Sequence, residues 1–138
     1  MKKLVRFGIA MEEPLLLDFD KEIRQKGYTN RSEAIRDLVR ESLVKQEWFS
    51  NKQVSGVISM VYNHHQRELV DKLLDVQHDY QDLIIANQHI HLDHHNCLEV
   101  IVTKGKAKDI QRLSDRLKSV RGVKHVNINM ATVGKELD

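Results

Sequence analysis

The sequence predicts an α+β protein that is built from two units, and three observations lead to this fold class. In residues 4–47 the apolar residues first recur at every second position and then at helical spacing, which indicates one strand followed by two helices. Residues 54–131 then alternate between strand-like and helix-like patterns. The chain has 138 residues with 41% hydrophobic and 30% charged side chains and a single proline, a composition typical of a folded globular protein.

The N-terminal unit begins with the stretch LVRFGIAM (4–11), in which apolar residues occupy every second position. Side chains two positions apart lie on the same face of a strand. One face would present Val5, Phe7, Ile9 and Met11, and the other would present Arg6, Gly8 and Ala10. This pattern predicts a strand that is buried on one face only.

Two helices are predicted to follow this strand. The first begins at Glu12-Glu13-Pro14, because proline is favoured in the first helical turn, and it ends at Gly27. The second begins after Asn30, with Glu33 three residues later as in a capping box. Their apolar stripes are Leu16, Phe19 and Ile23 in the first helix, and Ile35, Leu38, Val39 and Ser42 or Leu43 in the second.

A strand-helix-helix unit is too small to bury a core by itself, and its single strand has two open edges. Pairing with a two-fold mate solves both problems. It joins two strands into an antiparallel ribbon and stacks four helices beneath the ribbon. We therefore expect this unit to be dimeric.

The C-terminal unit follows a junction at WFSNKQ (48–53), where the pattern changes. The predicted elements are a strand at 54–62, a helix at 67–78, strands at 83–92 and 97–105, a helix at 107–119 and a strand at 123–131. The order βαββαβ is the split βαβ arrangement of ferredoxin-like folds. We expect one domain at residues 1–50 and a second at residues 51–138.

Charge and cysteine content narrow the function classes. The net charge of +2 says little about partners, but Lys2, Lys3 and Arg6 precede every acidic residue. A basic N-terminal segment is a weak indication that the chain binds phosphate groups. A segment that is simply exposed to solvent explains these charges equally well. The single cysteine excludes an internal disulfide, and no secretory signal or membrane-spanning run is present. A soluble cytoplasmic protein without a membrane partner is expected.

The stretch HIHLDHHNC (89–97) contains four of the eight histidines and the only cysteine. His89 and His91 are two positions apart on a predicted strand and therefore point to one face. Asp93 to Asn96 are typical hairpin-turn residues, and Cys97 begins the next strand. Two imidazoles and a thiolate can thus converge on one metal ion from a rigid sheet edge.

A fourth ligand could be His78, His64, His65, His94 or His95. His94 and His95 lie in the predicted turn and would strain to reach back, whereas His78 ends a helix and could reach the ion within one chain or across an interface. Tetrahedral Zn(II), planar Ni(II) and planar Cu(II) all suit such a set. The other histidines, His64, His65, His94, His95 and His125, are interpreted as structural.

An enzyme is not predicted. Cys97 beside histidines could act as a nucleophile, but no third orienting group is indicated and no helix begins after the thiol to lower its pKa. The sequence also contains no phosphate loop, no G-x-S-x-G and no dinucleotide fingerprint.

Three stretches resemble the nickel-responsive transcriptional regulators of the NikR family: GYTNRSEAIRDLVRE (27–41), QHDYQDL (77–83) and HIHLDHHNCLEVIVTKG (89–105). The resemblance implies an N-terminal ribbon-helix-helix dimer that places its ribbon in the DNA major groove. It also implies an ACT-like C-terminal domain that assembles a homotetramer, a dimer of dimers. One Ni(II) per chain would be bound in planar geometry by His89, His91 and Cys97 of one chain and His78 of its neighbour.

The resemblance implies further site residues. Tyr62 and Glu99 match positions whose side chains do not bind nickel themselves but orient the residues that do. Glu33 and Asp37 match a second, weaker cation site between the two domains, although a capping residue and a solvated helix acid explain them equally well.

The expected DNA contacts depart from the family pattern. The outward face of the ribbon usually carries an arginine and two hydroxyl residues, but here it carries Arg6, Gly8 and Ala10. Arg6 can still contact a guanine with two hydrogen bonds, while Ala10 can only touch a thymine methyl group. Lys3 and Arg67 are expected to contact phosphates.

The resulting prediction is a nickel-dependent DNA-binding regulator that recognises a palindromic operator and represses nickel-uptake genes. A metal-storage protein would use the same histidines and cysteine without needing the strand-helix-helix unit. A small-molecule-responsive ACT regulator would need no such metal ligands. A copper or zinc sensor on the same scaffold is the nearest alternative, because Cu(II) binds such donors at least as tightly.

Overall fold

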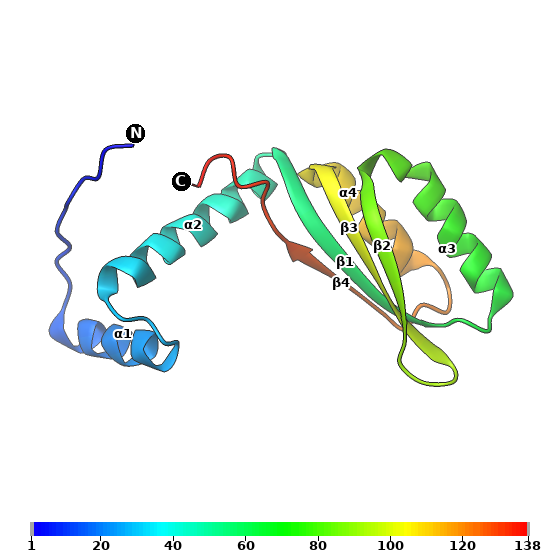
Figure 1. Cartoon of the computed structure of the whole chain (residues 1–138), viewed down its shortest axis with the longest axis horizontal. Helices are drawn as coiled ribbons and strands as arrows, with labels where there is room; N and C mark the ends of the chain where they lie inside the picture. The colour runs from blue at the N-terminus through cyan, green and yellow to red at the C-terminus, as the bar shows by residue number, and fades with distance from the viewer. Residues whose placement is uncertain (1, 138) are drawn as a thin grey trace. The chain divides into compact units, whose positions relative to one another are not determined.

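The computed structural model describes residues 2–137. The chain divides into two compact units, one ending at Arg40 and the other beginning at Glu41. The elements are α1 (Glu13–Gln25), α2 (Arg31–Phe49), β1 (Gln53–Asn63), α3 (Arg67–Asp79), the 3-10 turn η1 (Gln81–Leu83), β2 (Ile84–His91), β3 (Asn96–Lys106), α4 (Ala107–Ser119) and β4 (His125–Met130) (Figure 1). The division falls inside α2, nine residues before that helix ends at Phe49.

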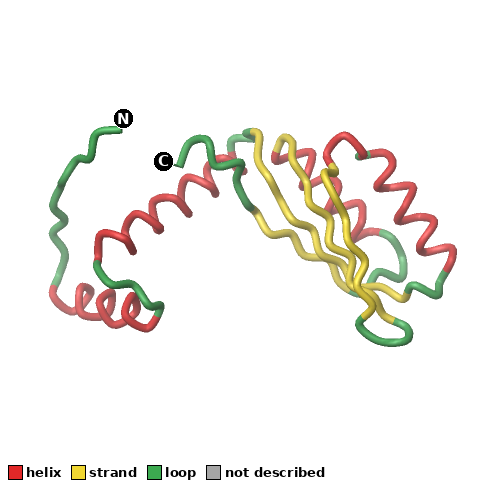
Figure 2. The backbone as a smooth tube through the Cα atoms, in the orientation of Figure 1, coloured by secondary structure: helices red, strands yellow, loops and turns green. Residues whose placement is uncertain are grey.

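The N-terminal arm (residues 2–11) differs from the prediction. The predicted strand at 4–11 does not form in the single chain, and Figure 2 shows this segment as a loop. The physical reason is that a strand needs a neighbour for its backbone N–H and C=O groups. The arm's apolar side chains are exposed as well, with Leu4 at 77% and Phe7 at 75%.

The two helices of the first unit begin as predicted. Pro14 lies in the first turn of α1, and Gly27 ends the helix with a positive φ of 85°. The Asn30 side chain accepts a hydrogen bond at 2.9 Å from the backbone N–H of Glu33, which caps α2. The guanidinium of Arg31 donates to both carboxylate oxygens of Asp20, at 2.8 and 2.7 Å, and so links α2 to α1.

The predicted junction at 48–53 is partly wrong, because α2 continues to Phe49. Trp48 explains the difference. Its indole is buried in the core of the second unit, and its Nε1 donates to the carbonyl of Ala131 at 2.8 Å. A Cβ atom on Gly56 would lie 3.0 Å from the same ring, so any other residue there would push the indole away by a few tenths of an ångström.

The second unit has the predicted βαββαβ order. Its sheet has the strand order β2-β3-β1-β4 with antiparallel pairing throughout, and α3 and α4 cover one face (Figure 1). Side chains alternate between buried and partly exposed along β1, as expected when one face carries the core. The largest fully buried side chains include Ile58, Met60, Leu73, Ile101, Ile110, Leu113 and Leu117.

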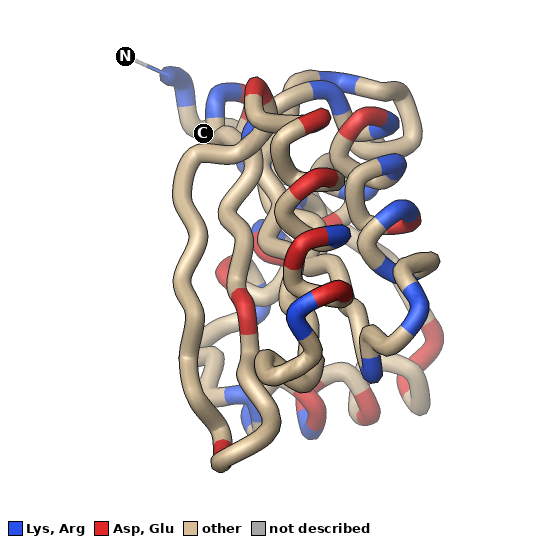
Figure 3. Tube along the Cα trace, turned by 90° about the vertical axis from the view of Figure 1, so that its right-hand side faces the viewer, with Lys and Arg blue, Asp and Glu red and all other residues tan. Residues whose placement is uncertain are grey.

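Charged residues lie mainly on the helices. Figure 3 shows blue and red positions interspersed along them, while most of the strand length is uncharged. No helix within residues 2–137 is long and apolar enough to cross a membrane.

Candidate metal centre

Three of the four residues predicted to bind metal, His89, His91 and Cys97, lie on one face of the sheet. His91 on β2 pairs with Cys97 on β3, and Cys97 pairs with Tyr62 on β1. Two residues along, His89 pairs with Glu99 in the same way. Directly paired residues on antiparallel strands point to the same face, so both histidines lie on the side of the sheet that holds the cysteine.

Burial changes sharply across this face. Cys97 is 1% exposed and Tyr62 is 2% exposed, because they lie on inner strands under the helices. His89 and His91 are exposed, because β2 is an edge strand. Tyr62, Cys97 and His91 form a row of paired residues across the three strands. The thiol in this row is buried, while the imidazoles on β2 can be reached by a second molecule.

A hydrogen-bond network holds a buried carboxylate behind His89. The Tyr62 hydroxyl donates to Glu99 Oε1 at 2.7 Å, and Gln77 Nε2 on α3 donates to Glu99 Oε2 at 2.9 Å. Asn87 on β2 adds a longer contact to the same oxygen at 3.4 Å. Glu99 is 1% exposed, and these donors supply the partners that a buried carboxylate requires.

The network also contacts the His89 ring. The Tyr62 hydroxyl oxygen lies 3.3 Å from His89 Nδ1, and Glu99 Oε1 lies 3.6 Å from His89 Nε2. The phenol of Tyr62 and the carboxylate of Glu99 contact the imidazole of His89 and fix its orientation. Metal-binding histidines commonly have such partners.

Electrostatics keep the thiol protonated in the absence of a metal. Burial raises the pKa of Cys97, and the nearby Glu99 carboxylate raises it further, while the Tyr62 hydroxyl opposes the shift. Burial and Glu99 also raise the pKa of Tyr62, so the phenol remains a donor. A metal that takes the thiolate must therefore displace a proton.

The predicted four ligands do not close into a site within one chain. His78 is exposed near the end of α3. In residues 2–137, one group of at least three His, Cys, Asp or Glu residues has ligand atoms within 4.8 Å of one another, and it does not include His78, His89, His91 or Cys97.

That group consists of three histidines that the sequence analysis interpreted as structural: His65, His94 and His95. They lie at the β2–β3 hairpin and just beyond the end of β1. The two His-His pairs at 64–65 and 94–95 could have revealed this, because β1 pairs with β3 as far as Asn63 opposite Asn96. Gln77 and Asn87 had no such indication in the sequence.

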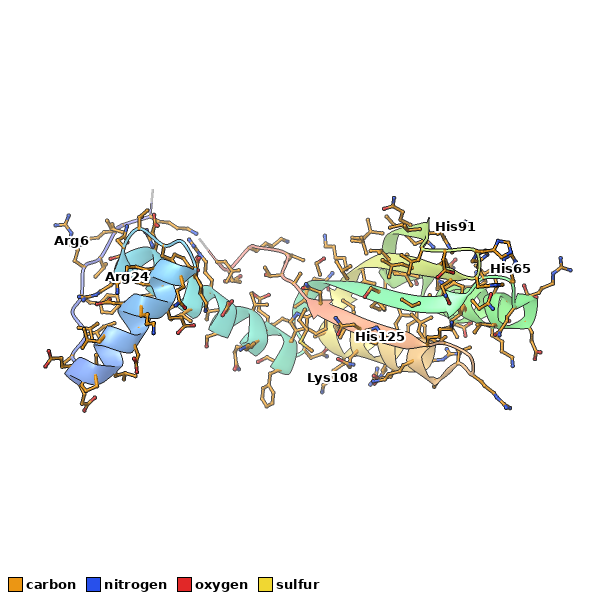
Figure 4. The ribbon with its side chains drawn as sticks, turned by 90° about the horizontal axis from the view of Figure 1, so that it is seen from below. Arg6, Arg24, His65, His91, Lys108 and His125 are labelled. Atoms are coloured by element: carbon orange, nitrogen blue, oxygen red, sulfur yellow. The ribbon has the colours of Figure 1, made fainter. Side chains whose placement is uncertain are left out.

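The predicted DNA-contacting residues of the arm, Lys3, Arg6, Gly8 and Ala10, are all exposed. Figure 4 shows Arg6 extending away from its backbone. A Cβ atom on Gly8 would have no atom within 4 Å, so the backbone there is open to close approach. Arg67 is the exposed first residue of α3.

Glu33 and Asp37, the residues of the predicted weaker cation site, have partners on their own unit. Thr29 donates to Glu33 Oε2 at 3.2 Å. Tyr28 donates to Asp37 Oδ2 at 2.8 Å, and this bond is the main reason why the pKa of Asp37 lies below its usual value.

Known proteins resemble this chain along its whole length. Residues 55–131 match the family model described as the NikR C-terminal nickel-binding domain. A relative from Thermococcus kodakarensis, whose name is nickel-responsive regulator, is 53% identical over 98% of this chain and 99% of its own length. Relatives of the same name from Geotalea uraniireducens and Syntrophus aciditrophicus are 52% and 48% identical, and each match covers at least 98% of both chains.

A solved structure shares the fold. An uncharacterized protein from Thermotoga maritima aligns with a TM-score of 0.52 at 15% identity, covering 56% of this chain and 96% of that one. The family model and the near full-length relatives agree with each other. The chain belongs to the NikR family of nickel-responsive regulators.

Proposed function

We propose that this chain is a nickel-dependent DNA-binding transcriptional regulator that works as a homotetramer in the cytoplasm. The observation that supports it best is the row that joins exposed His91 to buried Cys97, with Tyr62 and Glu99 behind it. These donors fit nickel, since imidazole and thiolate are ligands that Ni(II) accepts.

In this proposal one Ni(II) per chain is bound by His89, His91 and Cys97, and His78 of another copy completes the set. Two observations support a contribution from another copy. His78 is exposed on α3, and no three of these four residues have ligand atoms within 4.8 Å of one another in residues 2–137. The edge strand β2 also presents exposed apolar side chains, Ile85 at 62% and Ile90 at 38%, that a second molecule could cover. Bound nickel would supply a link between chains.

Helix α3 is the connection between the metal centre and DNA in this proposal. Gln77 near its C-terminal end is tied to Glu99 by a 2.9 Å hydrogen bond, and His78 is the next residue. Arg67 at its N-terminal end is exposed and available to a phosphate. Fixing one end of this rigid helix restricts the other end, so metal binding would favour the state that fits DNA.

DNA is contacted chiefly through the arm. A groove of about 770 Å³ within the first unit is lined by arm residues such as Phe7 and Ile9 and by helix residues such as Phe19 and Ile35. Arg6 and Ala10 also line this groove in the single chain. Pairing two arms into an antiparallel ribbon would cover the apolar part of the groove and turn Arg6, Gly8 and Ala10 outward. Glu33 and Asp37 would take a cation only if its binding displaced their present partners.

The test is selection of genomic DNA fragments by the purified full-length protein, with and without nickel at one stated salt concentration. We expect a few palindromic sites, adjacent to nickel-uptake genes, to be enriched only with nickel. Equal enrichment without nickel would remove nickel as the effector. Enrichment by copper or zinc instead would favour a sensor of that metal, and no enrichment with any of them would favour metal storage.

A further inference from the structure

Histidines gather where the end of β1 meets the β2–β3 hairpin. The antiparallel pairing of β1 with β3 brings the residues after Asn63 beside those before Asn96. The backbone N–H of His64 donates to the carbonyl of His95 at 3.1 Å, which joins the two segments directly. The sheet itself therefore sets the positions of these histidines.

Three of the side chains present nitrogens to one another. One ring nitrogen from each of His65, His94 and His95 lies within 4.8 Å of the others, and all three residues are exposed. Nitrogens bound to one ion at about 2.0–2.1 Å are at most about 4.2 Å apart. Small side-chain rotations, which exposed residues can make freely, would close this gap.

The hydrogen bond of His65 prepares it as a ligand. Its Nε2 lies 2.7 Å from the carbonyl oxygen of His94. A carbonyl oxygen only accepts, so Nε2 carries the proton and Nδ1 keeps the lone pair that a metal needs. Metal-bound histidines commonly have such a carbonyl on their other nitrogen.

The hairpin that presents His94 and His95 is firmly built. Asp93 Oδ1 accepts the backbone N–H groups of His95 at 2.9 Å and Asn96 at 2.8 Å. Lys124 Nζ donates to Asn96 Oδ1 at 2.6 Å, which fastens the tip to the segment before β4. A rigid support is what a metal site needs from its surroundings.

His64 places a buried, unpartnered nitrogen next to this group. Its Nε2 is buried and has no hydrogen-bond partner, the one such side-chain atom found within residues 2–137. Its ring lies 4.3 Å from that of His65 and stacks on that of His91 at 4.6 Å. A buried imidazole nitrogen without a partner is costly unless something occupies it.

We propose that the hairpin histidines (His65, His94 and His95) form a second metal site, with His64 as an available fourth ligand. It would bind a divalent transition ion of the kind that prefers imidazole, with Cu(II) favoured over Ni(II) and Zn(II). The site has no thiolate and faces solvent, so water completes the coordination and the ion exchanges readily. It shares no ligand with the proposed centre at His89, His91 and Cys97, although the His64 ring stacks on that of His91.

The test measures metal bound per chain by equilibrium dialysis of the full-length protein with NiCl₂ alone and with CuCl₂ alone, followed by elemental analysis. The doubly substituted variant His94→Ala/His95→Ala removes two hairpin ligands. The matched control is His125→Ala, an exposed histidine on β4, the edge strand opposite β2. Cys97→Ala removes the thiolate of the other centre, and circular dichroism checks that each variant is folded.

We expect two ions per chain in the natural sequence and in His125→Ala, and one in His94→Ala/His95→Ala. That double variant should keep its thiolate-to-metal absorption band. Cys97→Ala should lose this band and still bind the hairpin ion. Zn(II) should shift the side-chain NMR signals of the three hairpin histidines in Cys97→Ala.

Three results would overturn the proposal. The folded double variant could bind as many ions as the natural protein, the double variant could lose the thiolate band along with the second ion, or Cys97→Ala could show no Zn(II) shifts at the hairpin. Hairpin binding in a protein without a thiolate band would instead support this site and count against the centre at Cys97.

Discussion

Tyr62 shows how one hydroxyl group can serve both the fold and the proposed metal centre. Its oxygen lies against Glu99 at 2.7 Å and against His89 at 3.3 Å, so it orders both groups. Removing the hydroxyl would leave a buried carboxylate oxygen without its main donor, at a cost of about 1–3 kcal/mol.

Tyr62→Phe is expected to weaken nickel binding about 10–100-fold, because groups behind a ligand contribute affinity of that size. Competition titration against a chelator measures the effect. Tyr80→Phe is the matched control, since Tyr80 faces the Arg116 guanidinium instead. Equal affinities for the two variants would show that the hydroxyl does not support the site.

Arg6 is the arm residue with the greatest capacity to distinguish bases, because its neighbours on that face are Gly8 and Ala10. Arg6→Ala is expected to cost about 1–3 kcal/mol of discrimination between the operator and scrambled DNA. Fluorescence anisotropy with both DNAs measures it. Arg67→Ala should instead weaken binding to both about equally, since phosphate contacts are independent of sequence. An unchanged specificity ratio in Arg6→Ala would contradict this role.

At the scale of elements, the β2–β3 hairpin depends on the charge of Asp93. Hydrogen bonds from Asn96 and His95 lower the pKa of Asp93 to about 2. A carboxyl with a depressed pKa stabilises the folded form above its unfolded pKa of about 3.9. This contribution is lost as the pH falls through the folded pKa, so the hairpin should remain intact at pH 4.

NMR can follow this directly through the backbone amides of His95 and Asn96, which donate to Asp93. We expect their shifts to titrate with a midpoint near pH 2, the folded pKa of about 2. A midpoint near the unfolded value of about 3.9 would mean that these bonds do not form in solution.

Trp48 anchors the end of α2 in the second unit. Trp48→Ala is expected to reduce the free energy of unfolding by about 3–5 kcal/mol, because it empties a large buried volume and loses the bond to Ala131. Urea denaturation measures the change. Phe49→Ala is the control: Phe49 is 84% exposed, and its loss should change stability by less than about 0.5 kcal/mol. A loss under about 1 kcal/mol for Trp48→Ala would contradict the anchoring role.

The elements of the second unit could be predicted closely because their patterns are local. The predicted helix at 107–119 has the observed bounds. The period of two places His89 and His91 on one face, and pairing with the next strand adds Cys97 to it. The end of α2 could not be predicted, because Trp48 is buried by contacts with segments such as the one around Ala131. The role of Gln77 could not be predicted for a similar reason, since only the packing of α3 on the sheet brings it to Glu99.

At the scale of the whole molecule, what the sequence predicts for the arm depends on a second chain. The period of two in residues 4–11 is a strand pattern, yet the single chain offers no partner for its backbone. The proposed centre at Cys97 also depends on a second chain, because no three of His78, His89, His91 and Cys97 have ligand atoms within 4.8 Å of one another in residues 2–137. The domain limits 1–50 and 51–138 and the tetramer therefore remain predictions that measurements of assembly must test.

The proposed arm pairing can be tested by placing a charge on its apolar face. Phe7 is 75% exposed in the single chain and lines the groove of the first unit. Burying such a side chain contributes about 1.5–3 kcal/mol, and a two-fold dimer would bury two of them. Phe7→Asp replaces this gain with the cost of burying charge, so the first units should separate.

Amide hydrogen exchange of the full-length protein would then show slow exchange at residues 4–11 in the natural sequence and fast exchange there in Phe7→Asp. The tetramer, which the C-terminal domain is expected to assemble, should keep its mass in both. The matched control is Leu17→Asp, since Leu17 is 60% exposed on α1 and does not line the groove. This control should keep the slow exchange of the arm. If Phe7→Asp exchanged as slowly at residues 4–11 as the natural protein, the arms would not pair through this face, and the ribbon that presents Arg6 to DNA would have to form in another way.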